Sequence, residues 1–314
     1  MDVLHSFDGL AKTAGGVYLA IGVFDGVHLG HQRVIGQARD DARTAGGVSV
    51  VLTFDPHPMR ILQPEKAPPL LTSTSHKLRL IEGLGADTCL VLRFDKPFSG
   101  TSPEAFIEKI AQKRNQLREI CVGTRFRFGH HRAGDVRLIE QLAPAHGFTV
   151  KEIPSVHTGD GEMISSTAVR QHVLHGRLDR AAAMLGRPFS ILGTVKQGGH
   201  VGHQLGYPTA NLNPQNEALP PDGVYAVRVQ VGREQLGGVV NIGFRPTFAD
   251  RVRQREFEVH IFDFDRDIYG QDVEVVFLEK LRDEKKFDST DALKGQIAAD
   301  VRAARAIMAK GDQG

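Results

Sequence analysis

The sequence has little cysteine, no long apolar run and almost no net charge. Its two cysteines, Cys89 and Cys121, lie in apolar, strand-like stretches, so we expect buried, reduced thiols rather than a disulfide or a metal site. The first residues lack the apolar centre of a signal peptide, and no run has the length of a membrane span. We therefore expect a cytoplasmic protein with no membrane partner. A formal net charge of +2 also argues against a basic tail for nucleic acid.

The chain has 314 residues, too many for one ordinary hydrophobic core, and therefore favours two domains. Its hydrophobic and charged fractions of 41% and 24% are those of a folded, soluble protein. In the first half, predicted strands alternate with predicted helices, which indicates a parallel sheet covered by helices. The strands are expected at 16–24, 48–54, 87–94, 117–123 and 148–153, and the helices near 30–45, 74–84, 102–114 and 135–146.

After residue 187 the pattern changes, because Gly and Pro punctuate short strands and helical stretches are missing for nearly a hundred residues. Closely spaced antiparallel strands predict a small barrel. These strands are expected at 190–197, 223–232, 235–243, 255–264 and 272–281. A final helix should close one side or end of the barrel with an apolar stripe, formed by Leu293, Ile297, Val301, Ala304 and Met308. We place the boundary near Gly186, which gives domains 1–186 and 187–314.

The most informative stretch covers residues 20–31 and reads AIGVFDGVHLGH. A predicted strand ends there, glycines turn the chain, and a helix begins near Leu29. Free N–H groups at a helix start favour anions, and glycines let a phosphate approach closely. His28 and His31 lie on one side of the first turn and can donate hydrogen bonds to phosphate oxygens during in-line displacement. The alternative is a glycine-rich turn with two incidental histidines, and a zinc site is weaker because no third ligand lies nearby.

Two further segments can reach the same crevice, because parallel sheets bind ligands at the carboxyl edge of their strands. The segment ISSTAVR, residues 164–170, puts hydroxyls at a helix start with Arg170 one turn in. Such a group can hold the phosphates that leave as pyrophosphate, although by itself it is also an ordinary helix cap. In FDPHP, residues 54–58, two prolines fix a loop, and His57 is open to a structural or a substrate-binding interpretation.

The second half contains a glycine-rich connection at 193–202 followed by LGYPTAN, residues 205–211. Proline fixes the turn, and Thr209 and Asn211 alternate onto one face of an extended segment. A hydroxyl and an amide oxygen together could hold Mg²⁺ that bridges two ATP phosphates and neutralises charge during phosphoryl transfer. Glu258 shares one face of its predicted strand with His260 and could be a base, although an exposed strand glutamate is the commoner case.

These motifs, in this order and spacing, resemble a known family. GVFDGVHLGHQ, FDPHP, FRFGHHRAGD and ISSTAVR are similar to the adenylyltransferase half of bacterial bifunctional riboflavin kinase/FMN adenylyltransferases, also called FAD synthetases. GTVKQGGHVGHQLGYPTANL, PPDGVYAV, GVVNIGFRPTF, FEVHIFDF and KFDSTDALKGQI resemble the riboflavin kinase module. Together the two resemblances cover about residues 15–305.

The resemblance implies an α/β Rossmann-like HxGH nucleotidyltransferase domain followed by a six-stranded flavokinase β-barrel with a C-terminal helix. It implies an enzyme that phosphorylates riboflavin to FMN with ATP in the barrel. The first domain would then adenylylate FMN to FAD with release of pyrophosphate. The implied small molecules are riboflavin, FMN, ATP and Mg²⁺.

The resemblance also implies roles for single residues. In the first domain, His28 and His31 would stabilise the transition state at the α-phosphate of ATP. The nucleotide would be held there by Gly22, Phe24, Asp25, Gly30, Ser166, Thr167 and Arg170. In the barrel, Thr209 and Asn211 would hold Mg²⁺, and Glu258 would be the base for the ribityl 5′-hydroxyl. A flap over ADP would be formed by Gly193, Val195, Lys196 and Gly198.

Three positions depart from the family pattern. Arg125 stands where Asp or Asn is usual, and it can pair with the FMN phosphate, weaken the site or point to solvent. His203 stands where Arg is usual, and Tyr207 replaces a common Phe. Arg125 motivates an alternative, in which the chain is a monofunctional riboflavin kinase whose first domain only binds nucleotide or flavin. A flavin-responsive regulatory protein is less favoured, because His28, His31, Thr209, Asn211 and Glu258 are all present.

Overall fold

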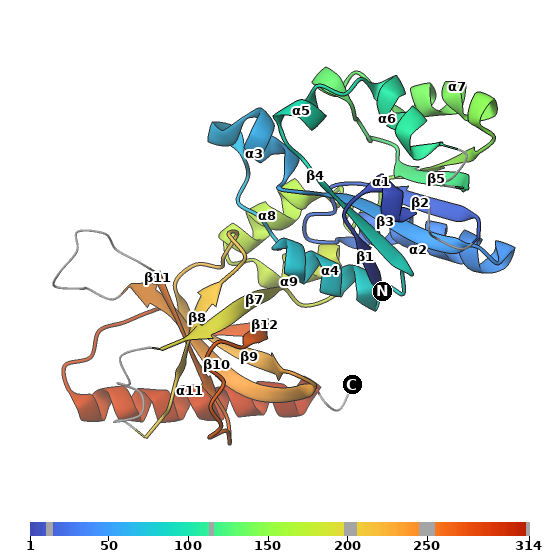
Figure 1. The fold of residues 1–314 in the computed structure, drawn as a ribbon. Coiled ribbons are helices and arrows are strands. Elements are labelled where there is room, and N and C mark those ends of the chain that lie inside the picture. The colour runs from blue at the N-terminus through green and yellow to red at the C-terminus, as the bar shows by residue number, and fades with distance from the viewer. Residues whose placement is uncertain (11–14, 113–115, 198–205, 245–254, 312–314) are drawn as a thin grey trace. The chain divides into compact units, whose positions relative to one another are not determined.

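The computed structural model describes residues 1–10, 15–112, 116–197, 206–244 and 255–311 (Figure 1). The chain divides into two compact units, one of Met1–Leu70 with Thr74–Val169 and the other of Leu71–Ser73 with Arg170–Gly314. Gly186, near which the sequence predicts the domain boundary, ends a helix in the left-handed conformation, with φ 68°. The division into domains 1–186 and 187–314 stays a prediction.

The first unit is built on a six-stranded parallel sheet with the order β1-β4-β3-β2-β5-β6. Its strands are β1 (Asp2–Leu4), β2 (Val17–Ile21), β3 (Val48–Asp55), β4 (Thr88–Arg93), β5 (Leu117–Gly123) and β6 (Thr149–Ile153). β3 and β4 are buried along nearly their whole length, as expected where helices cover both faces. The five predicted strands are confirmed. β1 escaped prediction because three mostly exposed residues carry no readable alternation.

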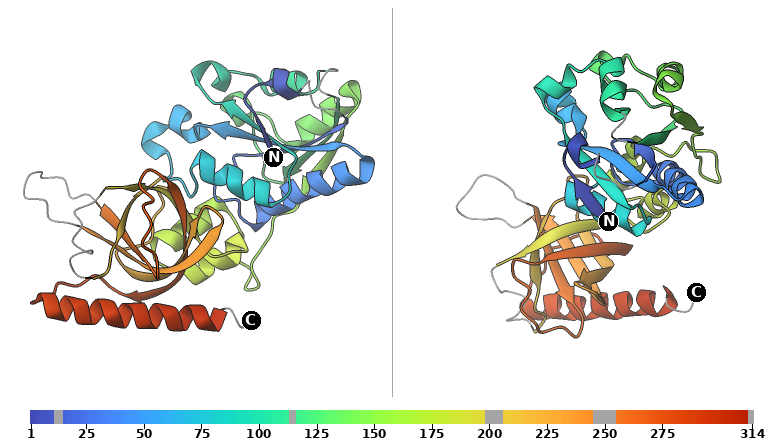
Figure 2. Two further views of the ribbon diagram at one scale, coloured as in Figure 1. Left: turned by 60° about the horizontal axis from the view of Figure 1, so that its bottom comes forward. Right: turned by 45° about the vertical axis from the view of Figure 1, so that its right-hand side comes forward.

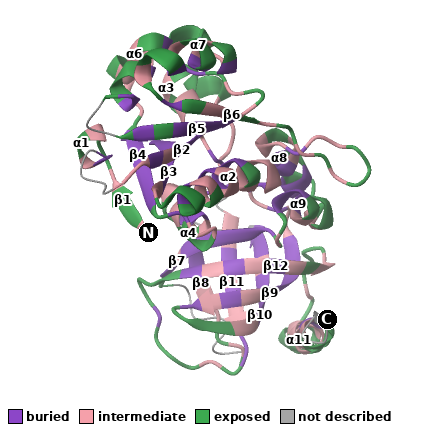
Figure 3. Cartoon of the chain, turned by 90° about the vertical axis from the view of Figure 1, so that its right-hand side faces the viewer, coloured by how far each residue is buried: buried purple, intermediate pink, exposed green. Residues whose placement is uncertain are grey.

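Two apolar cores lie on opposite faces of this sheet, whose strands β3 and β4 are coloured mostly as buried in Figure 3. One core joins the sheet to α6 (Pro103–Ile110) and α7 (Val136–His146), and the other joins it to α2 (Leu29–Ala45) and α4 (Thr74–Gly83). Neighbouring strand residues alternate between the cores, because successive side chains point to opposite faces. These four helices confirm the predicted ones, although α6 ends at Ile110, earlier than expected.

The remaining helical segments are short, and most were not predicted. A helix of one or two turns shows too little of the 3.6-residue period to be recognised in a sequence. They are α1 (Phe7–Leu10), α3 (Pro58–Leu62), η1 (Pro64–Lys66), α5 (Lys96–Ser99), η3 (His130–Arg132), α8 (Ser166–Leu174) and α9 (Leu178–Leu185).

The second unit contains a closed barrel of antiparallel strands in the order β10-β11-β8-β7-β12-β9, in which β9 also pairs with β10. The strands are β7 (Ser190–Lys196), β8 (Ala210–Pro214), β9 (Gly223–Val231), β10 (Glu234–Phe244), β11 (Arg255–Ile261) and β12 (Asp272–Arg282). Closure leaves no strand edge unpaired. The predicted barrel and its six strands are therefore confirmed, and β8 contains part of the segment expected only to be extended.

The last helix, α11 (Thr290–Gly311), lies along the barrel (Figure 2) and packs against β9, β10 and β12. Val301, Ala304 and Met308 of the predicted stripe belong to the apolar cluster between the helix and the strands. Leu293 and Ile297, nearer the start of the helix, line a pocket of the barrel. The predicted role of the stripe in covering the barrel is confirmed.

Both cysteines are free and buried, Cys89 in β4 and Cys121 in β5, which confirms the expectation of buried thiols. Burial raises the pKa of Cys89 to about 12, so this thiol stays protonated at neutral pH. Among the described helices, none combines the length and apolar character that a bilayer crossing requires.

Candidate active sites

The loop between β2 and α2 holds the histidine motif in a strained backbone. Phe24, Gly26 and Val27 have positive φ angles of 54°, 80° and 43°. Glycine adopts such angles freely, whereas a β-branched residue such as Val27 does so only where surrounding contacts impose it. At the end of the loop His28 caps α2, and its Nδ1 accepts a hydrogen bond from the backbone N–H of His31 at 3.3 Å.

The rings of His28 and His31 stack with centroids 3.6 Å apart and an interplanar angle of 19°. The ring of Phe24 meets His31 edge-on at 5.2 Å. A Cβ on Gly30 would lie 3.1 Å from the Cε1 of His28, so glycine leaves room for that ring. Burial, and then the charges of His28 and Lys77, hold the pKa of His31 well below its usual value. His31 is therefore neutral at neutral pH.

Lys77 of α4, which the sequence interpretation missed, holds the loop between β2 and α2 in place. Its Nζ donates hydrogen bonds to the carbonyl of Val23 at 3.2 Å, to the carbonyl of Phe54 at 3.3 Å and to Thr53 Oγ1 at 3.0 Å. Thr53 Oγ1 in turn donates to the carbonyl of Val23 at 3.0 Å. Burial lowers the pKa of Lys77, and the nearby charge of Asp25 opposes that change. A lysine in a helical stretch carries no sequence signal for this contact, which arises only from tertiary packing.

A cavity of about 680 Å³ opens beside the histidine pair. It lies beyond the carboxyl ends of β2, β5 and β6, next to the point where the strand order reverses between β2 and β5, where open α/β sheets bind ligands. The predicted residues that line it are Gly22, Phe24, His28, Gly30, His31, Ser166 and Thr167. We refer to it as the histidine cavity.

Two predicted residues of this site do not line the histidine cavity. Asp25 is buried, and its backbone carbonyl accepts a hydrogen bond from Ser166 Oγ at 2.8 Å, which ties the start of α8 to the loop. Arg170 is buried one turn further along α8. The side chain of Arg125 is exposed at the cavity wall, with a guanidinium nitrogen 3.0 Å from Met163 Sδ.

An apolar pocket of about 280 Å³ adjoins the histidine cavity and shares lining residues with it. Its walls carry six phenylalanine rings, and the centroid of each ring lies 5.3 to 6.0 Å from that of at least one other ring of the set. They are Phe54, Phe94, Phe98, Phe106, Phe126 and Phe128. Such a lining suits a flat, apolar ring system. We refer to it as the phenylalanine pocket.

The sequence interpretation did not identify the phenylalanine pocket. Its one available signal was that Phe54 and Phe94 stand at the carboxyl ends of adjacent predicted strands. His57 lines this pocket and also caps α3, where its Nδ1 accepts a hydrogen bond from the backbone N–H of Met59 at 3.2 Å. Both interpretations of His57, structural and substrate-binding, therefore agree with its position.

In the barrel, Glu258 lies in the middle of a row of polar residues on three adjacent strands. The strand register puts Asn211 of β8 on one side of it and Asn241 of β10 on the other. Directly opposite residues of antiparallel strands have their Cβ atoms about 5 Å apart on the same face. Glu258, Asn241 and Thr209 line a pocket of about 230 Å³. Asn241 had not been singled out, because a lone asparagine in a strand has no distinctive pattern.

The barrel pocket is completed by β12 and α11. Arg282 donates to both carboxylate oxygens of the buried Asp300, at 2.9 to 3.1 Å. Across the pocket, His260 Nδ1 lies 2.8 Å from the carbonyl of Pro208, and the ring of Tyr207 meets His260 edge-on. These contacts position the segment that contains Thr209.

The predicted flap begins in β7, where Gly193, Val195 and Lys196 all lie. Lys196 is opposite Asn211 in the β7–β8 register. Val195 and Thr209 line another hollow of about 290 Å³. Gly198 and His203 lie outside the described residues, so their predicted roles stay predictions.

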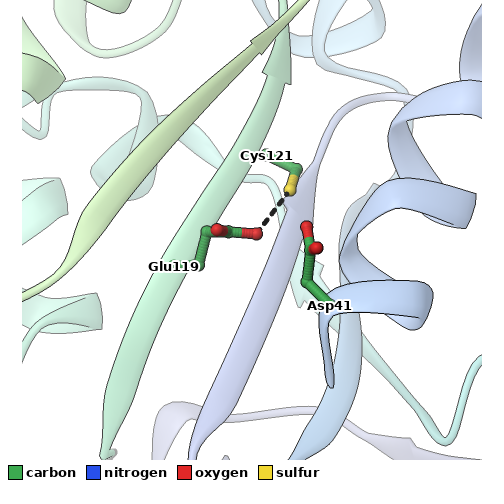
Figure 4. Close-up of side chains that lie close together, drawn as sticks. All are labelled: Asp41, Glu119 and Cys121. Atoms are coloured by element: carbon green, nitrogen blue, oxygen red, sulfur yellow. Dashed lines mark hydrogen bonds between the residues drawn. The ribbon is translucent and has the colours of Figure 1, made fainter. Parts of the chain in front are cut away.

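A further polar cluster consists of Asp41, Glu119 and Cys121 (Figure 4), which line neither the histidine cavity nor the phenylalanine pocket. Cys121 Sγ donates to Glu119 Oε1 at 3.3 Å, and Lys151 Nζ lies 2.6 Å from Asp41 Oδ2. Burial raises the pKa values of Glu119 and Cys121. The thiol is therefore protonated at neutral pH, and through Lys151 the cluster links α2, β5 and β6.

These features define a class of protein. A strained loop with two histidines at a sheet switch point, together with a carboxylate-lined barrel pocket, is the arrangement expected of a transferase that acts on phosphate groups. The family model for FAD synthetase matches residues 10–168, and the one for riboflavin kinase matches residues 185–308. The chain belongs to the family of bifunctional riboflavin kinase/FMN adenylyltransferases, as the resemblance of its motifs indicated.

Curated relatives match almost end to end. The bifunctional riboflavin kinase/FMN adenylyltransferase of Escherichia coli (strain K12) is 40% identical over 291 residues, 92% of each chain. That of Pseudomonas fluorescens is 38% identical over 309 residues, 98% of each chain. A solved structure described as a macrolide-efflux protein from Streptococcus pneumoniae has a TM-score of 0.80 and 32% identity, and the alignment covers 96% of this chain and 98% of that one.

Proposed function

We propose that the chain phosphorylates riboflavin to FMN in its barrel and adenylylates FMN to FAD in its parallel-sheet domain. ATP is the co-substrate of both steps. The observation that supports this proposal is that residues proposed for each site lie close together: His28 and His31 stack beside a cavity, and Glu258 lies between Asn211 and Asn241. Family membership supports both activities.

In the first domain, a phosphate oxygen of FMN attacks the α-phosphorus of ATP, and the bond to the β-phosphate breaks to release pyrophosphate. The flavin ring fits the phenylalanine pocket, and ATP fits the histidine cavity. Since Nδ1 of His28 accepts a hydrogen bond, its Nε2 is left as the donor toward a phosphate oxygen. The neutral His31 offers a second ring N–H. Ser166, Thr167 and Arg170 would hold the departing phosphates, and Gly22, Phe24, Asp25 and Gly30 would shape the pocket.

In the barrel, Glu258 accepts the proton of the ribityl 5′-hydroxyl while the hydroxyl oxygen attacks the γ-phosphorus of ATP, and ADP leaves. Thr209 and Asn211 offer a hydroxyl and an amide oxygen, donors that suit Mg²⁺. When bound, the ion would neutralise charge on the ATP phosphates. Gly193, Val195, Lys196 and Gly198 would cover the nucleotide.

We also propose that the protein acts in the cytoplasm. The need for ATP at both steps and the two free, buried cysteines support that location. Cell fractionation that found the chain in another compartment would contradict it. We propose no nucleic-acid partner, in keeping with the balanced charge of the chain.

The alternative of a monofunctional kinase rested on Arg125. The exposed guanidinium of Arg125 lies against Met163, and both histidines remain at the cavity wall. The bifunctional assignment is therefore the better supported one.

The product profile over time tests the assignment. Purified protein with riboflavin, ATP and Mg²⁺ should produce FMN first and FAD afterwards, with ADP and pyrophosphate as the respective by-products. FMN without FAD or pyrophosphate, even when FMN and ATP are supplied directly, would establish the kinase-only alternative. Absence of both products would overturn the proposal.

A further inference from the structure

The segment between β5 and α7 is folded under strain. Gly129, His131 and Arg132 have positive φ angles of 72°, 54° and 58°. Residues other than glycine adopt this conformation only at an energetic cost, so other contacts must impose it. Such strain is often found where a side chain is aimed for function.

Several contacts impose this conformation. Phe128 and Gly134 exchange two backbone hydrogen bonds of 3.1 and 3.0 Å, which close the loop. A Cβ on Gly129 would lie 2.7 Å from the backbone nitrogen of Pro103, so only glycine allows this close approach to the start of α6. The backbone N–H of His130 donates to the carbonyl of Thr101 at 2.9 Å.

The loop places Arg132 at the junction of the phenylalanine pocket and the histidine cavity. Among the described residues, four line both: Val23, Phe126, Arg127 and Arg132. Two of the four are arginines, and no described lining residue of either space is an aspartate or a glutamate. The junction is therefore an electropositive strip between an apolar pocket and a phosphate-binding cavity.

The guanidinium groups of the two arginines differ in their hydrogen bonds and ion pairs within the described residues. One guanidinium nitrogen of Arg127 lies 2.6 Å from Asp135 Oδ2, which fixes the side chain and leaves its other N–H groups available. Within the part of the chain that the structure describes, the Arg132 guanidinium has no hydrogen bond or ion pair. An arginine fork binds the oxygens of a phosphate through two parallel hydrogen bonds.

We propose that Arg132, with Arg127 beside it, forms a subsite for the phosphate monoester of the flavin, so that this domain selects FMN over riboflavin. The inference rests on the proposed function. With the ring system in the phenylalanine pocket, the ribityl chain leads the phosphate to the junction, next to the histidines. The two guanidinium charges also offset the repulsion between the FMN phosphate and the ATP triphosphate.

The test compares flavin binding by the full chain and its Arg132→Ala variant, without ATP, by titration calorimetry. Loss of charge-assisted hydrogen bonds to the phosphate should weaken FMN binding at the first domain by about tenfold to a hundredfold. Riboflavin binding should be unchanged, because riboflavin lacks the phosphate. Arg137→Ala, which removes an exposed arginine of α7, is the matched control and should alter neither affinity.

Equal weakening of FMN and riboflavin binding by Arg132→Ala would show a merely structural role and overturn the proposal, as would no change in either. A selective loss of FMN binding in Arg125→Ala instead would assign the phosphate to Arg125. If Arg132→Ala does not fold, Arg132→Lys keeps the charge without the fork and should show a smaller, still FMN-selective loss. FAD formation by the wild-type chain, measured in parallel, tests the proposed function separately, since the binding comparison does not require turnover.

Discussion

At the scale of single residues, the chemistry depends on environments that the tertiary structure creates around recognisable side chains. His28 and His31 are prominent in the sequence. Their stacked rings, and the lowered pKa of His31 caused by burial and by the neighbouring charges of His28 and Lys77, belong to the folded state only. The neutral form of His31 is therefore a property of the fold.

The lowered pKa of His31 predicts acid sensitivity of the first domain. In the unfolded chain His31 binds a proton near pH 6.5, whereas the folded state binds it only at lower pH. The stability that His31 contributes is thus fully present above pH 6.5 and is lost as the pH falls through that value toward the folded-state pKa. Urea titrations between pH 5 and 8 should show that the free energy of unfolding declines less steeply with falling pH in His31→Gln than in the wild type. Identical slopes would contradict the prediction.

At the scale of elements, each proposed site depends on a contact between two segments that are separate in the sequence. α4 supports the β2–α2 loop through the ammonium group of Lys77, and α11 holds the barrel wall through Asp300. Neither residue belongs to a catalytic motif. Both were invisible in the sequence, because their partners are far away along the chain.

Replacement of Lys77 by Met should weaken the loop that carries the histidines. The variant keeps the volume and removes the donor for the carbonyls of Val23 and Phe54, at a cost of about 1–3 kcal/mol in unfolding free energy. FAD formation should fall, mainly through kcat, while FMN formation from riboflavin should be unchanged. Denaturation curves and both activities measure this. An exposed lysine of the same domain, Lys109, changed to Met is the control.

Replacement of Asp300 by Asn should affect the barrel alone. The change removes the carboxylate that pairs with the Arg282 guanidinium. Loss of one partner of a buried ion pair lowers the free energy of unfolding by about 3 kcal/mol. Arg282 and Asp300 line the pocket that also contains Glu258, so we expect a raised KM for riboflavin and a less stable barrel. FAD formation from added FMN serves as the internal control and should persist. Unaltered riboflavin kinetics would count against this role for α11.

At the scale of the whole molecule, His28 and His31 lie in the first unit and Glu258 lies in the second, so that the two steps can be separated by mutation. His28→Ala should convert riboflavin only to FMN, with FAD formation reduced by about a hundredfold or more. Glu258→Gln should make FAD only from added FMN.

An equal mixture of His28→Ala and Glu258→Gln should therefore form FAD from riboflavin and ATP, because FMN released by one variant can be used by the other. Chromatography of the flavins over time measures this, with each variant alone as the control. Failure of the mixture, when both single activities are intact, would mean that FMN does not pass between molecules.

The sequence by itself determined much of this protein. Alternating strands and helices predicted the parallel sheet, and closely spaced strands predicted the barrel, because side-chain periods of 3.6 and 2 residues are local properties. The motif around His28 was likewise readable, since it is contiguous in the chain, whereas the role of Glu258 as a base was expected only from the family resemblance.

The tertiary structure decided which distant residues meet. Lys77, Asn241, Arg132 and the six rings of the phenylalanine pocket acquire their roles only when separate strands end at one edge or pair across a barrel. No local sequence pattern predicts those contacts, because they depend on strand order, register and packing between segments tens of residues apart. A strained loop such as the one that aims Arg132 is stable only through contacts that the folded state supplies.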